Sequence, residues 1–235
     1  MNLVHNMRTR ILLKLSGLFL QQPNPAAVLE KLAHQLKKLS SSHQFGIVIG
    51  GGNFFRGDQQ GKQYQLTPSY GHTIGMLATV MNALILEDLL TKAGIMIAHF
   101  CALSIPTIGQ PLDMNALHKA LMHHDVILFS GGTGNPFFTT DTTAFVRALQ
   151  IDAQEVWKAT MVDGIYTKDP QVHADAQYLD TVSYAYALEH DLRIFDTTAY
   201  VLGKTHAMPA RVFNSTTPDA LVRAAQDPTF GSRIQ

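Results

Sequence analysis

The sequence predicts an α/β fold: a three-layer α/β/α arrangement with a largely parallel central sheet between two layers of helices. Short apolar runs typical of strands alternate with longer segments of helical periodicity along the whole chain, and this is the pattern of parallel strands joined by helices. Glycines or polar residues directly follow several of the apolar runs. With 235 residues, 46% hydrophobic and 15% charged, the chain is large enough to bury one substantial core, so we expect a single domain over residues 1–235.

In the first half of the chain, three apolar runs predict strands and two periodic segments predict helices. Pro25 opens the first helix, which runs to Leu39, and Asn24 is its expected cap. The second helix, Gly71–Ala93, repeats apolar residues at helical spacing, and its Met residues are expected to fill the core. The repeated residues are Ile74, Leu77, Ala78, Met81, Leu84, Ile85 and Leu89. The segment Gln59–Tyr70 is polar and aperiodic, which predicts a loop. The predicted strands are Arg10–Leu15, Phe45–Ile49 and Ile95–Phe100.

The second half continues the alternation. Thr140 or Asp141 is expected to cap the helix that begins there. Asp163-Gly164 is a strong hairpin signal, so short strands are expected on either side of it within residues 162–166. The remaining predicted strands are Asp125–Phe129, Glu155–Thr160 and Arg211–Asn214, and the remaining predicted helices are Asp113–His123, Thr140–Leu149, Val182–His190, Asp196–His206 and Pro218–Ala225.

Bulk properties restrict the classes of partner. The formal net charge is zero, from 18 basic and 18 acidic residues, so there is no overall positive field to attract nucleic acid or a membrane surface. Cys101 is the only cysteine and lies in an apolar context, which predicts a buried thiol in a reducing compartment. Met1–Arg10 lacks the apolar core of a secretion signal, and the strand-like runs are too short to span a bilayer. We therefore expect a cytoplasmic protein without nucleic-acid or membrane partners.

Four strand exits carry the residues most suited to chemistry: Lys14–Gly17, Gly50–Gly52, Gly131–Asp141 and Lys158–Thr160. In an open parallel sheet, ligands bind beyond the carboxyl ends of the strands, so these exits should converge on one edge. Glycines allow backbone N–H groups to approach an anion, and helix starts attract phosphate. A glycine turn that binds nothing is the alternative for any one loop alone, but four converging exits favour an anion site.

The charged residues near these exits suit phosphoryl transfer, although two common phosphate loops are missing. The P-loop pattern is absent, and the dinucleotide pattern G-x-G-x-x-G fails because Phe55 and Phe137 occupy its last glycine position. Transfer of a phosphoryl group needs cations and a means of holding Mg²⁺. The available cations are Lys14, Arg56 and Lys158, and the available carboxylates are Asp141 and Asp196. The alternatives are that Lys158 pairs with a buried carboxylate such as Asp163, and that Asp141 and Asp196 only cap helices.

Six sequence motifs together resemble those of the bacterial uridylate kinases (UMP kinases), a family within the amino acid kinase superfamily. The resemblance extends over nearly the whole chain, and GMLATVMN and GTGNPFFTTD are its most specific parts. The motifs are KLSG (Lys14–Gly17), GGGNFFRG (Gly50–Gly57), GMLATVMN (Gly75–Asn82), GTGNPFFTTD (Gly132–Asp141), KATMVDGIYTKDP (Lys158–Pro170) and RVFN (Arg211–Asn214).

The resemblance implies the amino acid kinase fold and transfer of the γ-phosphoryl group of ATP to UMP, with Mg²⁺, in pyrimidine nucleotide biosynthesis. It implies a homo-oligomer, typically a hexamer, with UMP bound mainly by the N-terminal part and ATP mainly by the part from about residue 150. The implied catalytic residues are Lys14, Asp141, Lys158 and Asp196, the two acids orienting Lys14 or helping to place Mg²⁺. The implied ATP contacts are Lys14, Leu15, Ser16, Gly17, Gly52, Arg56, Thr160, Tyr166 and Asp169. The implied UMP contacts are Gly51, His72, Thr133, Gly134, Asn135, Pro136, Phe137, Phe138, Thr139 and Thr140.

The chain departs from the family pattern at three places. His72 stands where the family has an aspartate that binds the UMP ribose, and a neutral imidazole has one acceptor nitrogen where a carboxylate can accept from two hydroxyls. The segment after KLSG is short, and Leu18 replaces a usual glutamate. Ala98 and residues 123–125 occupy the places of basic residues that the family uses for activation by GTP.

Two other functions remain open at this stage. One is a kinase of the same fold that phosphorylates a carboxylate or carbamate, against which the run GTGNPFFTTD favours UMP. The other is a catalytically weakened or regulatory nucleotide-binding protein, which His72 and the altered effector region suggest.

Overall fold

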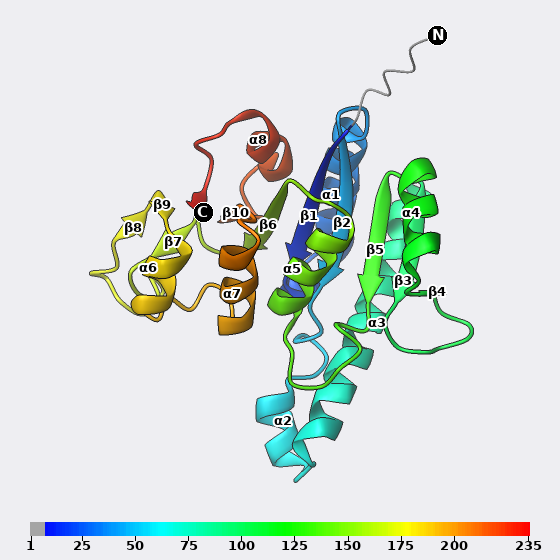
Figure 1. Cartoon of the computed structure of the whole chain (residues 1–235), viewed down its shortest axis with the longest axis horizontal. Helices are drawn as coiled ribbons and strands as arrows, with labels where there is room; N and C mark the ends of the chain where they lie inside the picture. Colours follow the sequence, from blue (N-terminus) through cyan, green and yellow to red (C-terminus); the bar gives the residue numbers. More distant parts are fainter. Residues whose placement is uncertain (1–7) are drawn as a thin grey trace.

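The structure, a computed structural model, describes residues 8–235 and is built on one nine-stranded sheet (Figure 1). Its order is β4-β3-β5-β2-β1-β6-β10-β11-β9. The central strands are parallel to one another, as the alternation of strands and helices predicted. They are β3 (Ile97–Cys101), β5 (Val126–Ser130), β2 (His43–Ile49), β1 (Thr9–Leu15), β6 (Glu155–Thr160) and β10 (Ala210–Asn214).

The short edge strands were not predicted. β4 (Gln110–Pro111) extends the sheet beside β3, while β11 (Ser232–Ile234) and β9 (Thr181–Val182) extend it beside β10. β11 runs antiparallel to β10. Strands of two or three residues carry too little periodicity to be recognised from the sequence alone.

The helices form two layers, so the predicted three-layer arrangement is confirmed. On one face lie α1 (Pro25–Leu39), α3 (Pro68–Lys92) and α8 (Ala220–Gln226). On the other face lie α4 (Met114–His123), α5 (Thr140–Gln150), α6 (Tyr184–Glu189) and α7 (Thr197–Thr205). α2 (Gly57–Gln63) packs on the start of α3 beyond the sheet edge, and the 3₁₀ helix η1 (Gly17–Gln21) follows β1 directly.

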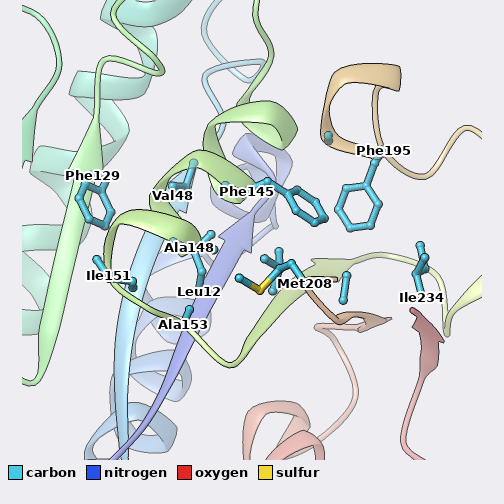
Figure 2. Close-up of a cluster of buried hydrophobic side chains, with 14 of the residues drawn as sticks. Leu12, Val48, Phe129, Phe145, Ala148, Ile151, Ala153, Phe195, Met208 and Ile234 are labelled. Carbon is cyan, nitrogen blue, oxygen red and sulfur yellow. The ribbon is translucent and has the colours of Figure 1, made fainter. Parts of the chain in front are cut away.

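Each face of the sheet has its own hydrophobic core, because side chains of a strand alternate between faces. In β1, Ile11 and Leu13 pack toward α1 and α3, whereas Leu12 packs on the opposite side with Phe129 and Ala148. Figure 2 shows this second cluster, in which the rings of Phe145 and Phe195 meet edge to face with centroids 5.2 Å apart. These apolar cores hold the central strands in register.

The orientation of α3 differs from the sequence prediction. Met81, expected to fill the core, and Leu77, Leu84 and Ile85 of the same repeat are each about 40% exposed or more. The buried face instead carries small, polar and other apolar residues: Met76, Ala78, Thr79, Val80, Asn82, Ala83, Leu86 and Leu90. α3 is long and apolar enough to cross a membrane by length and composition, but 44% of its most apolar stretch is buried inside the protein. Because α3 is apolar nearly all round, its periodicity could not identify the buried side.

Two loop predictions were wrong. Residues 59–70, expected to be a loop, contribute to α2 and to the first turn of α3, because Gly57 and Gly71 allow the two helices to meet closely. The Asp163-Gly164 hairpin is also absent, since β7 (Ile165–Tyr166) pairs with the distant β8 (Tyr178–Leu179). In both places, contacts with a remote segment override the local pattern.

The helix caps were predicted in part. The Asn24 side chain caps α1 by accepting from Ala27 N at 3.2 Å, as expected. The cap of α5 is Thr139 rather than Thr140 or Asp141, and its hydroxyl accepts from Asp141 N at 3.0 Å. Asp141 therefore lies inside the helix, and its carboxylate is free to bind other groups.

Candidate active site

The four strand exits lie together at one edge of the sheet, as predicted. β5, β2, β1 and β6 are consecutive neighbours in the sheet and run in the same direction. Lys14 of β1 lies directly opposite Lys158 of β6 in the register. The carboxyl ends of these strands point toward α2 and the start of α3 (Figure 1). The fold thus brings two cations and three glycine-rich or polar loops to one place.

Asp141 holds the two lysines together. Lys14 Nζ lies 2.8 Å from Asp141 Oδ1, and Lys158 Nζ lies 2.9 Å from Asp141 Oδ2. All three side chains are largely buried, between 11% and 15% exposed. Like charges opposite one another on neighbouring strands repel, and the carboxylate of Asp141 between the two lysines offsets this repulsion.

The electrostatics of this cluster have opposing causes. Burial raises the pKa of Asp141, but attraction to Lys14 and Lys158 outweighs it and lowers that pKa to about 2. Burial, together with repulsion from Lys14, lowers the pKa of Lys158 to about 8, although attraction to Asp141 opposes this. The cluster at neutral pH contains two ammonium groups and one carboxylate, so it carries one net positive charge in a partly dry site.

Lys158 has further partners that fix its position. Its ammonium group donates to the Ile194 carbonyl and lies 4.7 Å from the centroid of the Phe195 ring. Its carboxylate partner is Asp141, so the alternative pairing with Asp163 was wrong; Asp163 instead accepts from Asn214 Nδ2 at 3.0 Å. The ring contact and the ion pair both favour the protonated form of the amine.

Asp196 caps α7 and ties it to α5. Its carboxylate accepts from Ala199 N at 2.8 Å, from Thr142 N at 3.1 Å and from the hydroxyls of Thr142 and Thr139. The capping alternative therefore holds for Asp196. Among the described residues, Asp196 makes no hydrogen bond with Lys14, so any orienting effect of Asp196 on that lysine is indirect.

The second glycine loop, Gly50–Gly57 after β2, is anchored by a buried asparagine that the sequence did not indicate. Asn82 Nδ2 donates to the Gly50 carbonyl at 2.6 Å, and the side-chain amides of Asn82 and Asn53 bond to each other in both directions, at 2.7 and 3.0 Å. The loop also lies close to α3, since a Cβ on Gly51 would come within 2.7 Å of Ala78 Cβ. Only glycine fits there.

The third glycine loop, Gly131–Asp141 after β5, is held by hydrogen bonds from two helices. Gly131 N donates to Thr79 Oγ1 of α3 at 2.9 Å, and the Gly132 carbonyl accepts from Arg147 Nη2 of α5 at 2.9 Å. Gly131, Gly132 and Gly134 all have positive φ angles, between 60° and 82°, a conformation that glycine adopts without strain.

The outer part of this loop faces the start of α3. Phe137 is 66% exposed and has a positive φ of 71°, a strained conformation for an aromatic residue. Its ring lies 4.8 Å, centroid to centroid, from the imidazole of His72. Strained backbone is commonly found at ligand sites, so this contact marks one end of the candidate pocket.

Three of the expected ATP contacts line a cavity of about 580 Å³ beside Lys158, namely Thr160, Tyr166 and Asp169. The Leu15 side chain lies elsewhere, in a second cavity of about 610 Å³ between α1 and the loop before α8. Leu15 can therefore face the site only through its backbone, whose carbonyl accepts from Gly50 N. Arg56 is exposed and bonds to the Gly52 carbonyl at 3.2 Å.

The described residues form no cluster of three or more His, Cys, Asp or Glu side chains that could hold a metal ion. Both oxygens of Asp141 already contact lysines, and those of Asp196 accept from backbone and hydroxyl groups. Mg²⁺ commonly keeps several waters and binds through one or two carboxylates together with substrate phosphates. The carboxylates of Asp141 and Asp196 therefore fit a Mg²⁺ ion that arrives already bound to the phosphates of a nucleotide.

Sequence analysis missed the supports beneath the loops: Thr79, Asn82 and Arg147. Each is a polar residue on the buried face of a helix. A signal was present in α5, where Arg147 lies among apolar residues at helical spacing. In α3 the polar residues Thr79 and Asn82 did not stand out, because the helix is apolar nearly all round and its buried face could not be identified from the sequence.

The chain matches the family model described as "Amino acid kinase family" over residues 9–214. It is 40% identical over 230 residues to the uridylate kinase of Sodalis glossinidius, covering 96% of this chain and 95% of that protein. It is 41% identical over 230 residues to that of Actinobacillus pleuropneumoniae, covering 96% and 97%. Among solved structures, UMP kinase from Ureaplasma parvum superposes with a TM-score of 0.89 at 29% identity, covering 97% of this chain and 99% of that one. UMP kinase from Bacillus anthracis does so with a TM-score of 0.90 at 28% identity, covering 97% and 96%.

The anchoring of the second glycine loop can be tested by replacing Asn82 with Ala. We expect the free energy of unfolding to fall by about 2–3 kcal/mol, because the Gly50 carbonyl and the Asn53 amide lose buried partners. Chemical denaturation measures this change. Asn24→Ala, which removes an exposed hydrogen bond at the cap of α1, is the matched control and should cost about 1 kcal/mol. Equal losses in the two variants would contradict the anchoring role.

Proposed function

Because the chain belongs to the amino acid kinase family, and within it to the uridylate kinases, we infer that it transfers the γ-phosphoryl group of ATP to UMP, giving UDP and ADP. The observation that carries this inference is the buried cluster of Lys14, Asp141 and Lys158 at the meeting point of three loops. Its net positive charge lies where loops with exposed backbone amides can hold two phosphate-bearing ligands. Positioned cations and amides are the main requirement of phosphoryl transfer.

We propose that the two lysines stabilise the charge on the migrating phosphoryl group. A phosphate oxygen of UMP attacks the γ-phosphorus of ATP, and the bond from that phosphorus to the bridging oxygen of ADP breaks. Lys14 and Lys158 neutralise the oxygens of the transferring group, while Asp141 keeps both ammonium groups in place. No side chain need act as a strong base, because the UMP phosphate already presents an anionic oxygen.

The two nucleotides occupy opposite sides of this cluster in our proposal. ATP lies on the side of the cavity lined by Thr160, Tyr166 and Asp169, with its phosphates toward Ser16, Gly17 and Gly52. UMP lies over residues 133–140 and Gly51, with its ribose toward His72. Gly17 supports this arrangement, since a Cβ there would come within 2.5 Å of Asn53 Oδ1 and 2.7 Å of the Gly50 carbonyl, so the two phosphate-side loops are in close contact.

We further propose that Mg²⁺ accompanies ATP and, when bound, neutralises charge on its phosphates. The apolar face of α3 formed by Leu77, Met81, Leu84 and Ile85 is a suitable surface for self-association, which supports a homo-oligomer, a hexamer by family resemblance. A cytoplasmic location suits an enzyme that uses ATP and UMP. We also propose that, within a single domain, UMP binds mainly to the N-terminal part and ATP mainly to the part from about residue 150.

An assay of UDP formation tests the proposed function. The purified chain is supplied with Mg-ATP and, separately, with UMP, CMP, carbamate and glutamate. We expect turnover with UMP to exceed turnover with each of the other acceptors. Equal or better use of carbamate or glutamate would favour a carboxylate or carbamate kinase. UMP binding by calorimetry without formation of UDP would favour the regulatory alternative.

The lowered pKa of Lys158 predicts an alkaline limb in the pH profile. Because the pKa lies at about 8 and catalysis needs the protonated amine, kcat/KM for ATP should fall as pH rises through about 8. In kcat the limb should lie at higher pH, because bound phosphates favour the ammonium form. Asp141, with its pKa at about 2, stays ionised throughout. Lys158→Arg keeps its charge at all these pH values and should lose the alkaline limb, whereas an unchanged limb would assign it to another group.

The ribose contact is tested by His72→Asp. A carboxylate can accept hydrogen bonds from both ribose hydroxyls, and charged hydrogen bonds are stronger than neutral ones, so UMP should bind on the order of 3- to 10-fold more tightly. Isothermal titration with UMP measures the change. His72→Asn, which has a single acceptor oxygen and no charge, is the control and should stay close to the unsubstituted protein. If His72→Asp binds UMP no better, His72 does not face the ribose.

A further inference from the structure

Arg147 is a buried cation that the mechanism above does not use. It lies in α5 and is only 3% exposed. Its guanidinium group donates from Nη2 to the Gly132 carbonyl at 2.9 Å and from Nη1 to Gln150 Oε1 at 2.7 Å. It also lies 5.7 Å from the centroid of the Phe129 ring. All three of these partners are formally neutral.

The charge of Arg147 lacks compensation within the described part of the protein. No carboxylate of residues 8–235 forms an ion pair with it, and its Nε atom is buried without a hydrogen-bond partner. Burial lowers its pKa to about 10, so the group is still charged at neutral pH. Burying a charge without a counter-charge is costly, and within the described chain only neutral hydrogen-bond acceptors and one aromatic ring offset part of that cost.

A second buried arginine shows what a compensated site looks like in the same protein. Arg211, also 3% exposed, pairs with Glu155 at 3.2 Å and donates to the carbonyls of Ala224 and Asp227. Arg147 is buried to a comparable depth, but no acidic side chain of residues 8–235 pairs with it. The difference indicates that the negative charge that complements Arg147 comes from outside the chain.

The geometry of the Gly132–Thr133 peptide shows where that anion would bind. The peptide is trans, because the described chain contains no cis peptide bond, so its C=O and N–H groups point in opposite directions. The C=O group points to Arg147, and the Thr133 N–H therefore points away from it, to the opposite side of the loop. Within residues 8–235, the Thr133 N–H has no hydrogen-bond acceptor.

Resting on the proposed function, we propose that Arg147 is a positioning residue for the phosphate of UMP. Its guanidinium group holds the Gly132–Thr133 peptide with the N–H directed at the phosphate, and it places an uncompensated positive charge below that peptide. The hydrogen bond to the carbonyl also polarises the peptide, which strengthens the N–H as a donor. The anion bound above the loop then supplies the charge that Arg147 lacks.

Arg147→Met tests this role, because it removes the charge and the donors while keeping an apolar side chain of similar length. We expect KM for UMP to rise on the order of tenfold or more, the size of effect typical of losing a charge-assisted contact. KM for ATP should change by less than about twofold, because Arg147 shares no partner with the groups proposed to bind ATP, and sites without shared partners act nearly independently. The midpoint of thermal unfolding should stay the same or rise, because a costly buried charge is gone and the half-buried Gly132 can bond to water instead.

Two further variants make the result specific. Arg147→Lys restores the charge but not the planar fork, so it should recover part of the UMP affinity. Arg211→Met should lower the unfolding midpoint, because Glu155 loses its partner, and should leave KM for UMP unchanged. This pair separates the loss of a charge near the phosphate from the loss of any buried arginine.

The outcomes are distinct. Weaker UMP binding at unchanged or higher stability supports the inference. A lower midpoint with parallel increases in both KM values would mean that Arg147 is only structural, and an unchanged KM for UMP would likewise overturn the inference while leaving the UMP kinase function intact. If the unsubstituted protein forms no UDP, the proposed function fails first, and the inference falls with it.

Discussion

Two lysines that face each other on neighbouring central strands impose the constraint on which the site depends. Lys14 and Lys158 are register partners and both are largely buried. Their repulsion is offset by one carboxylate, Asp141, which α5 must deliver between them. The cap at Thr139 and the clamp at Asp196 fix the first turn of α5, and the apolar face of that helix fixes its height above the sheet. The position of the Asp141 carboxylate therefore depends on how the helix layer that contains α5 packs on the sheet.

The loops around this cluster are held by polar residues that helices project into the protein. Asn82 and Thr79 of α3 bond to the second and third glycine loops, and Arg147 of α5 bonds to the third. Glycine loops have little side-chain packing of their own, so hydrogen bonds from rigid helices give them a defined shape. In the proposed function, the same contacts would couple the binding of each nucleotide to helix packing, because displacing either helix would move a loop.

The candidate site was predictable to the extent that it follows from strand ends. Lys14, Lys158 and the glycine runs each end an apolar strand, and parallel strands bring their carboxyl ends to one edge, so their convergence followed from the pattern. The partner of Lys158 could not be predicted, since Asp163 is nearer in sequence and only the path of α5 brings Asp141 to the lysine. The support at Asn82 was missed because α3 is apolar nearly all round and its buried side could not be identified, whereas Arg147 lies on the apolar face of α5 and was overlooked there.

The alternation of strands and helices, the largely parallel sheet and the edge at which the charged residues gather could all be predicted from the sequence, because hydrophobic periodicity and glycine positions are local properties. Long-range contacts settled which side of α3 is buried, that most of residues 59–70 belong to α2 and to the first turn of α3, and that Ile165–Tyr166 pairs with Tyr178–Leu179 instead of closing a hairpin. Each of these depends on a partner that lies far away along the chain. The free energy gained from such contacts outweighs local preference, and periodicity within one segment does not record it.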